Sequence, residues 1–139
     1  MAIDFKAITL DIIDIASRTD ANMYINKDYI TFNKGVIEEL NYSAYVQFGV
    51  DKDNLVFAIR ACKGTESRAM PFSKPRPEQL TPISIRNKVV YDIVCHLIDD
   101  YNPDNRYKVT GYYDNQSRTV FFDMSETILT DFVWTKKKK

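Results

Sequence analysis

Residues 45–60 of the chain read YVQFGVDKDNLVFAIR and have the pattern of a β-hairpin. Two runs rich in β-branched and aromatic residues flank a polar turn of Asp51, Lys52, Asp53 and Asn54, and Asp and Asn tolerate the left-handed backbone that such turns require. A second stretch with the same pattern, YKVTGYYDNQSRTVFF, occupies residues 107–122. The sequence therefore predicts two hairpins of similar design within one short chain.

Each predicted hairpin follows a short strand and a short helix. In the first half, YITF (residues 29–32) is typical of a strand, and KGVIEELNY places Val36, Ile37 and Leu40 on one helical face. In the second half, ISI (residues 83–85) precedes a helix predicted from apolar residues at helical spacing, which are Val89, Val90, Ile93, Leu97 and Tyr101. The repeated order indicates an internal structural repeat, although an unrepeated α+β domain can also have it.

These patterns predict the fold class α+β, with tandem strand-helix-hairpin units packed as a pseudo-dimeric antiparallel β barrel or sheet with flanking helices. One unit is too small to bury its own apolar face, whereas two units can share a core. We expect a single compact domain over residues 1–139. Its predicted parts are a first unit at 28–72, a proline-rich linker at 73–82, a second unit at 83–128 and a basic C-terminal tail at 129–139.

The N-terminal segment precedes both units. Its apolar residues Phe5, Ile8, Ile12 and Ile15 recur at spacings of three and four residues. This spacing favours an amphipathic helix that ends near Ser17, although the isoleucines also suit a strand.

The composition limits the class of protein. The chain has 139 residues, of which 45% are hydrophobic, so it can bury one core. Its formal net charge is zero, so any electrostatic attraction to nucleic acid or to a membrane must be local. Cys62 and Cys95 lie far apart and form no disulfide framework, so we expect a cytoplasmic protein. No apolar run is long enough to cross a bilayer.

The most uneven charge lies between Arg60 and Arg76, where five cations accompany only Glu66. Basic residues in a loop that contains Gly and Pro can contact nucleic-acid phosphates, and the alternative is a solubilising loop without a partner. Two further cations lie at the start of the second unit. The predicted nucleic-acid-binding residues are Arg60, Lys63, Arg68, Lys74, Arg76, Arg86 and Lys88.

Other cations could form a second surface for an anionic ligand. The candidates are Arg86, Lys88, Arg106, Lys108 and Arg118, but aspartates are interspersed among them, so ordinary surface charge is the favoured interpretation. The four lysines at 136–139 are interpreted as a solvated tail that could add non-specific attraction.

The aromatic residues of the second hairpin allow two interpretations. Tyr112, Tyr113, Phe121 and Phe122 could stack on nucleic-acid bases. In hairpins such residues more often form cross-strand core pairs, and this interpretation is favoured.

The sequence predicts no catalytic or metal site. His96 is the only histidine, and the adjacent Cys95 would point about 100° away from it on a helix, so the two are not arranged as a catalytic couple. Asp99, Asp100 and Asp104 lack the spacing of a calcium loop, and the four glycines form no phosphate-binding or nucleophile motif. We therefore expect no enzyme activity and no cofactor.

Residues 30–60, ITFNKGVIEELNYSAYVQFGVDKDNLVFAIR, resemble the AbrB-type swapped-hairpin module, and two such modules in one chain are similar to the arrangement of MraZ proteins. The resemblance implies a DNA-binding transcription regulator built as a dimeric or pseudo-dimeric barrel that grips DNA with arginines. Asn33 stands where the family has a proline, Ile37 and Glu38 stand where it has paired arginines, and Tyr29 stands where arginine is frequent. The resemblance therefore transfers none of the family's DNA-binding residues.

The whole chain also resembles small proteins carried by phages and integrative elements of Gram-positive bacteria. This resemblance rests on the segment AIRAC and on the later segments RYKVTG and VFFD, in that order. The expected function is that of a non-catalytic DNA-binding transcription regulator of a phage or mobile element, with double-stranded DNA as its partner. The alternative is an anti-CRISPR-like inhibitor of a host defence nuclease that acts by direct protein contact. A homodimer is a further expectation, and no association with a membrane is expected.

Overall fold

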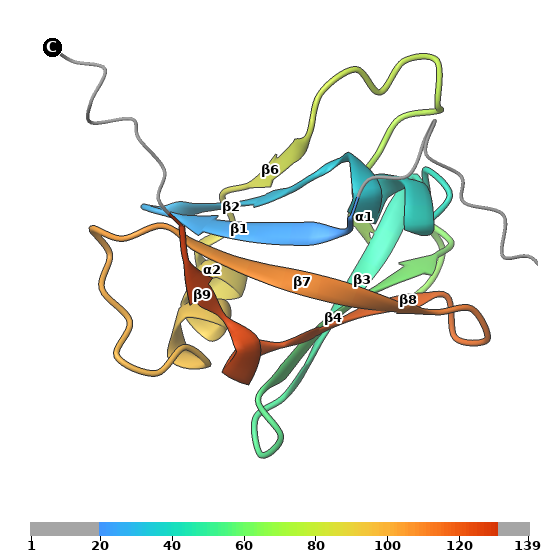
Figure 1. Cartoon of the computed structure of the whole chain (residues 1–139). Coiled ribbons are helices and arrows are strands. Elements are labelled where there is room, and N and C mark those ends of the chain that lie inside the picture. The colour runs from blue at the N-terminus through green and yellow to red at the C-terminus, as the bar shows by residue number, and fades with distance from the viewer. Residues whose placement is uncertain (1–19, 131–139) are drawn as a thin grey trace, which may run out of the picture.

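The computed structural model of the chain describes residues 20–130, whose strands form a strongly curved antiparallel half-barrel accompanied by two helices (Figure 1). This arrangement confirms the predicted α+β class. The predicted helix at residues 5–17 and residues 131–139 of the predicted basic tail lie outside the described residues.

The first half of the described chain contains β1 (Asn22–Asn26), β2 (Tyr29–Phe32), α1 (Lys34–Glu39), β3 (Tyr45–Asp51), β4 (Val56–Cys62) and β5 (Met70–Pro71). The second half contains β6 (Ile83–Ile85), α2 (Lys88–His96), β7 (Tyr107–Asp114), β8 (Thr119–Asp123), a 3-10 helix (Met124–Glu126) and β9 (Ile128–Leu129). Both predicted hairpins are confirmed, as β3–β4 and β7–β8. Neither α1 nor α2 of this described part is long and apolar enough to span a membrane.

The two halves of the chain alternate within the sheet. The strands lie in the order β5-β3-β4-β8-β7-β1-β2-β6, and β9 pairs with β7. β4 of the first hairpin pairs with β8 of the second, and β2 pairs with β6. β1, from the beginning of the described chain, pairs with β7. Pairs between residues that are far apart in the sequence therefore hold the sheet together.

The sequence pattern does not predict β1, which precedes the expected start of the first unit at residue 28. Its sequence NMYIN begins and ends with asparagine, a residue depleted in strands. The segment is nevertheless extended, because it pairs with β2 on one side and with β7 on the other. Its Met23 and Ile25 side chains are fully buried, so long-range packing outweighs the local preference.

Phenylalanine side chains from both halves form the centre of the core. Phe57 of β4 lies directly opposite Phe122 of β8, and their ring centroids are 6.4 Å apart. The ring centroid of Phe32, on β2, lies 6.1 Å from that of Phe122. None of the three side chains is more than 2% exposed. The two hairpins and β2 therefore share one core.

α2 is shorter than the sequence pattern predicts. Asn87 caps its first turn by accepting a hydrogen bond from the Val90 backbone N–H over 3.1 Å, and the helix ends at His96. The helix therefore does not extend to Tyr101, and Asp100, just before it, has a positive φ of 55°, which lies outside the helical region. Val89, one of the apolar residues on which the helix prediction rests, is 67% exposed. The reason is that Val90 lies on the buried face, and the residue before it on a helix points about 100° away.

The turns of the two hairpins have the same internal hydrogen bonds. Asp51 accepts a hydrogen bond from the backbone N–H of the residue three positions later over 3.2 Å, and Asp114 does the same over 3.1 Å. The residue after each donor has a positive φ, 57° at Leu55 and 56° at Arg118. The two turns are therefore built in the same way despite different residues at most positions.

The turn carboxylates make the hairpins sensitive to acid. Hydrogen bonds from turn residues hold the pKa values of Asp51 and Asp114 below the ordinary value of 3.8. A carboxyl group with a lowered pKa contributes stability above its unfolded pKa and loses it as the pH falls through the folded pKa. We expect Asp114→Asn, which keeps an acceptor but loses the charge, to lower the melting temperature at neutral pH. The difference from the native chain should begin to shrink as the pH falls below about 4 and should disappear once the pH is below the folded pKa of Asp114. Thermal unfolding followed by circular dichroism measures it, and a difference independent of pH would contradict this explanation.

Candidate nucleic-acid interface on the outer face of the sheet

The outer face of β6, β2, β1 and the first half of β7 carries polar and cationic side chains. The alternate residues of β1 and β2 point the other way and are buried in the core. Residues directly opposite each other on antiparallel strands point to the same face. The pairing register therefore places Ser84, Thr31, Tyr24 and Lys108 in one row across the four strands.

A chain of side-chain hydrogen bonds fixes this face. The hydroxyl oxygens of Ser84 and Thr31 are 3.2 Å apart, and Thr31 Oγ1 accepts from Asn26 Nδ2 over 3.2 Å. Asn26 Oδ1 accepts in turn from Arg106 Nε over 2.7 Å. Side chains therefore connect β6, β2 and β1 with the residue that precedes β7.

Two arginines lie over tyrosine rings on the same face. The guanidinium carbon of Arg106 is 4.3 Å from the Tyr24 ring centroid, and that of Arg86 is 4.4 Å from the Tyr29 ring centroid. Such contacts hold a planar guanidinium in a fixed orientation. Burial lowers the pKa of Arg106, but an arginine remains protonated at neutral pH. We call Tyr24, Tyr29, Arg86, Arg106 and Lys108 the tyrosine–arginine face.

The tyrosine–arginine face is locally positive in a chain whose net charge is zero. It carries three cations, and the outward positions of β6, β2, β1 and the first half of β7 hold no carboxylate, whereas Asp114 lies at the far end of β7. Acidic residues lie at its rim. Asp28 follows Lys27 in the β1–β2 turn, and Asp104 lines a shallow cavity of about 310 Å³ together with Arg106.

Three of the residues predicted to bind nucleic acid lie around the end of β4. Arg60 is on the strand, where its Nε donates to a glutamine of β3 over 3.1 Å, and Lys63 and Arg68 are exposed on the following loop. Arg118 of the second hairpin joins them, because its backbone C=O accepts from the Ala61 N–H over 3.0 Å. This group is separated from β1 by β8 and β7 in the sheet.

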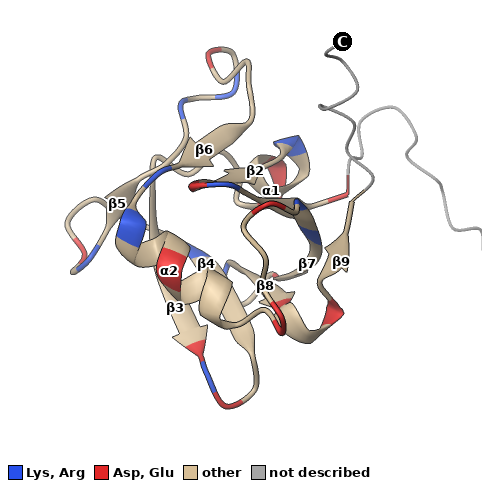
Figure 2. Cartoon of the chain, turned by 90° about the vertical axis from the view of Figure 1, so that its left-hand side faces the viewer, with Lys and Arg blue, Asp and Glu red and all other residues tan. Residues whose placement is uncertain are grey.

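The other four predicted residues lie further along the chain. Lys74 and Arg76 are exposed on the connection between β5 and β6, and Lys88, at the start of α2, forms an ion pair with Asp92 at 3.1 Å. Arg86 alone of the seven belongs to the tyrosine–arginine face. Figure 2 shows basic and acidic residues interspersed over the connection to β6, over α2 and over the β3–β4 turn. The seven predicted residues therefore form no single surface.

From the sequence alone, Arg106 and Lys108 are candidates for a surface that binds an anionic ligand, with ordinary surface charge as the favoured interpretation, and Tyr24 has no role. Tyr24 and Arg106 meet because β1 pairs with β7, a contact between distant parts of the chain. The sequence NMYIN does contain a local signal for the outward position of Tyr24. Apolar and polar residues alternate in it, so that in a strand Tyr24 points to the face opposite that of Met23 and Ile25. The arginine partner has no such signal, so the pair emerges only from the fold.

The aromatic residues of the second hairpin divide between two faces. Tyr112 and Phe121 lie opposite each other on the outer face and are 57% and 39% exposed. Phe122 is fully buried, and Tyr113 packs against the core. The prediction of core pairs is therefore right for Tyr113 and Phe122 and wrong for Tyr112 and Phe121. The cause is that adjacent residues of a strand point to opposite faces.

The described residues contain no cluster of three or more His, Cys, Asp or Glu residues that could hold a metal ion. The Nδ1 atom of His96 lies 2.7 Å from the Asp92 carbonyl oxygen in the last turn of α2. Burial raises the pKa values of the Cys95 and Cys62 thiols, so both stay protonated at neutral pH. These two thiols are not activated nucleophiles.

The chain was compared with known protein families, curated proteins and solved structures. The chain matches no protein-family model, no curated protein and no solved structure. The function is therefore inferred from the tyrosine–arginine face and from the organisation of the sheet that presents it.

Proposed function

We propose that this protein is a non-catalytic DNA-binding protein that contacts the phosphates of double-stranded DNA through the tyrosine–arginine face and regulates transcription for a phage or mobile element. The observation that carries the proposal is the pair of arginines stacked on tyrosines of β1 and β2, on a part of the sheet (β6, β2, β1 and the first half of β7) whose outward positions lack carboxylates. A guanidinium held in one orientation presents paired N–H donors, which suit bidentate contact with phosphate oxygens.

The size of the face suits one DNA backbone. Four neighbouring strands at a spacing of about 4.8 Å give a width of about 14 Å. Because the phosphates of one DNA strand wind around the duplex as they advance about 3.4 Å each along its axis, a face of this width can contact only a few of them. The three cations of the face suit such a short stretch of one backbone. The hydroxyl groups of Thr31 and Ser84 add neutral hydrogen-bonding groups of the kind that position a protein on DNA.

The arginine stacking favours duplex over single-stranded DNA. Proteins that bind single strands without sequence preference stack bases on open aromatic rings. On the tyrosine–arginine face, guanidinium groups already lie over the Tyr24 and Tyr29 rings. We therefore expect duplex DNA to bind at least as tightly as a single strand of the same length, because phosphate contacts and not base stacking supply the affinity.

We propose further that the two halves are related like the subunits of a dimer fused into one chain. The equivalent hairpin turns support this relation, and so do the helix starts, where Asn33 and Asn87 each cap the helix through the backbone N–H three residues later. Each cap precedes a lysine in an ion pair with the carboxylate four residues along, Lys34–Glu38 and Lys88–Asp92. The strand pairs β4–β8 and β2–β6 join equivalent strands in antiparallel fashion, as a two-fold axis requires.

A salt titration with matched variants tests the DNA-binding proposal. The chain should be shortened after Thr130, which removes the terminal lysines, and titrated against random duplex DNA at several salt concentrations. We expect binding at low salt with a slope of log K against log salt of about −3, because three cations each release about 0.9 counterion. The variant Arg86→Gln/Arg106→Gln/Lys108→Gln should lose this binding. The control Lys63→Gln/Lys74→Gln/Arg76→Gln removes the same charge elsewhere and should keep it.

The partly buried Arg106 requires a second variant, because its loss can also disturb β1. Arg86→Gln/Lys108→Gln leaves Arg106 in place and should still reduce the slope by about 2. Equal losses in the face variants and in the control variant would show non-specific attraction and overturn the proposed interface. If the shortened chain does not bind duplex DNA at low salt, DNA binding is wrong and the alternative of inhibition by direct protein contact becomes the better proposal.

A further inference from the structure

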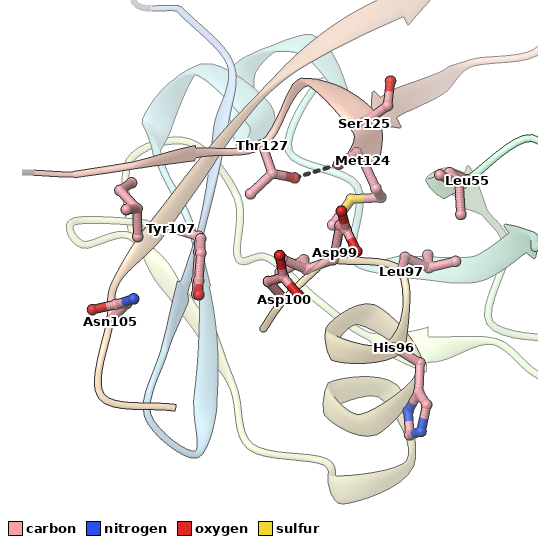
Figure 3. A pocket seen from close by; sticks show the side chains of 12 residues that line it. Leu55, His96, Leu97, Asp99, Asp100, Asn105, Tyr107, Met124, Ser125 and Thr127 are labelled. Carbon is pink, nitrogen blue, oxygen red and sulfur yellow. Dashed lines mark hydrogen bonds between the residues drawn. The ribbon is translucent and has the colours of Figure 1, made fainter. Parts of the chain in front are cut away.

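A groove separates α2 from the β3–β4 turn on one side and from the chain around β9 on the other. It consists of two adjoining cavities of about 670 and 500 Å³, which share Leu55, His96 and Leu97 among their lining residues. Figure 3 shows the larger cavity, with Tyr107 on one side, Leu97 and Leu55 on the other and Met124 between them. We call the two cavities together the α2 groove.

Apolar side chains line the α2 groove while remaining open to solvent. Val89 of α2 is 67% exposed, Leu129 of β9 is 60% exposed and Leu55 of the turn is 38% exposed. Single exposed apolar residues are common on protein surfaces, but a group of them around one concave site marks an interaction surface. The groove therefore suits an occupant that supplies apolar side chains.

The charge of the α2 groove limits the occupant further. Asp92, Asp99 and Asp100 line it, and among its described lining residues Lys52 is the sole lysine or arginine. Figure 3 shows Asp99 and Asp100 between Tyr107 and Leu97 in the larger cavity. Carboxylates beside an apolar surface favour a partner segment that combines apolar residues with positive charge.

The chain carries such a segment next to the groove. Leu129 lines the groove, Thr130 donates its backbone N–H to the Arg106 C=O over 2.9 Å, and the described residues end there. Residues 131–139 read DFVWTKKKK, so Asp131 is followed by three apolar residues, one threonine and four lysines, and the segment carries a net charge of +3 from four lysines and one aspartate. At about 3.3–3.6 Å per residue, an extended chain places residues 132–134 within about 10–18 Å of Leu129.

We propose that the C-terminal segment 131–139 of the same chain is the occupant of the α2 groove, with its apolar residues between α2 and β9 and its lysines near Asp99 and Asp100. Because the segment begins two residues after the lining residue Leu129, its effective concentration at the groove is high, so weak contacts suffice. This inference does not depend on DNA binding. It also assigns a role to Val89, whose apolar side chain is exposed on α2.

Trp134 is the only tryptophan of the chain, so its fluorescence reports on this segment alone. The full chain should show Trp134 several-fold less accessible to acrylamide quenching than in a free peptide with the sequence of residues 130–139. The variant Leu55→Asn/Val89→Asn should raise the accessibility toward that of the peptide. Asparagine tolerates the positive φ of Leu55, so the turn is preserved. The control Leu80→Asn changes an apolar residue that is 85% exposed outside the groove and should leave the accessibility unchanged.

The carboxylates supply an independent test. The variant Asp99→Asn/Asp100→Asn should weaken the shielding of Trp134, because the attraction between the carboxylates and the lysines is lost while the apolar walls remain. The shielding that remains should depend little on salt, because salt weakens only the interaction between charges. If Trp134 is as accessible to acrylamide in the full chain as in the free peptide, the proposal is overturned. Shielding that the groove variants leave unchanged would overturn it too, since the tryptophan would then be packed elsewhere. Shielding that increases with protein concentration would assign the segment to a second copy and contradict docking within one chain.

Discussion

Replacing Phe122 with alanine should lower the free energy of unfolding by about 3–5 kcal/mol. The Phe122 side chain is fully buried and lies directly opposite Phe57, so its removal leaves a cavity where β8 meets β4. Its ring also packs near Phe32 of β2, at 6.1 Å between ring centroids. The loss would therefore weaken the contact between both hairpins and β2. Urea unfolding followed by circular dichroism measures the change.

Phe121 provides the matched control for this substitution, because it is the same residue type one position earlier on the same strand. Its side chain is 39% exposed on the outer face. We expect Phe121→Ala to cost about 1 kcal/mol or less, as for other surface substitutions. Equal effects of the two substitutions would show that the core does not lie between β4, β8 and β2.

The substitution Gly111→Ala should also destabilise the protein, by about 2–3 kcal/mol. A methyl group at Gly111 would lie 2.5 Å from Val120 Cγ1 and 2.8 Å from Phe122 Cε1. Both neighbours are fully buried and cannot move aside without disturbing the core. Gly111 also lies where β7 changes partners, from β1 to β8. Chemical unfolding of the variant gives the magnitude.

The first hairpin contains a control glycine, Gly49 of β3. A methyl group there would meet no atom within 4 Å. We expect Gly49→Ala to be neutral or to stabilise the protein by up to about 1 kcal/mol, because alanine loses less backbone entropy on folding. If the two glycine variants were equally stable, close packing would not explain the choice of glycine at residue 111.

The hairpins are predictable from the sequence because their signals are local. Alternating apolar residues define the strands, and aspartate and asparagine define the first turn within a few positions of one another. The start of α2 also has a local signal, because Asn87 caps its first turn. The end of α2 has no such signal, since the apolar spacing continues to Tyr101, whereas the helix ends at His96 and Asp100 already has a positive φ.

The sequence groups the cations Arg86, Arg106 and Lys108 as one candidate surface, but their stacking on Tyr24 and Tyr29 is not predictable, because the partners lie on or next to four different strands. Arg86 lies just after β6 and stacks on a tyrosine of β2, while Arg106 precedes β7 and stacks on a tyrosine of β1. The charge run between Arg60 and Arg76 is conspicuous in the sequence, but the fold divides it between the end of β4 and the connection to β6. A run of cations in the sequence therefore does not by itself predict a cationic surface on the folded protein.

A titration of the isotopically labelled chain with duplex DNA, followed by amide chemical shifts in nuclear magnetic resonance spectra, tests the proposed interface most directly. The chain shortened after Thr130 should be used at low salt, so that the terminal lysines do not contribute. Binding through the tyrosine–arginine face predicts that the shifted amides cluster in β1, β2, β6 and the first half of β7. Shifts that cluster around Arg60 and the β4–β5 loop, or no shifts at all, would contradict it.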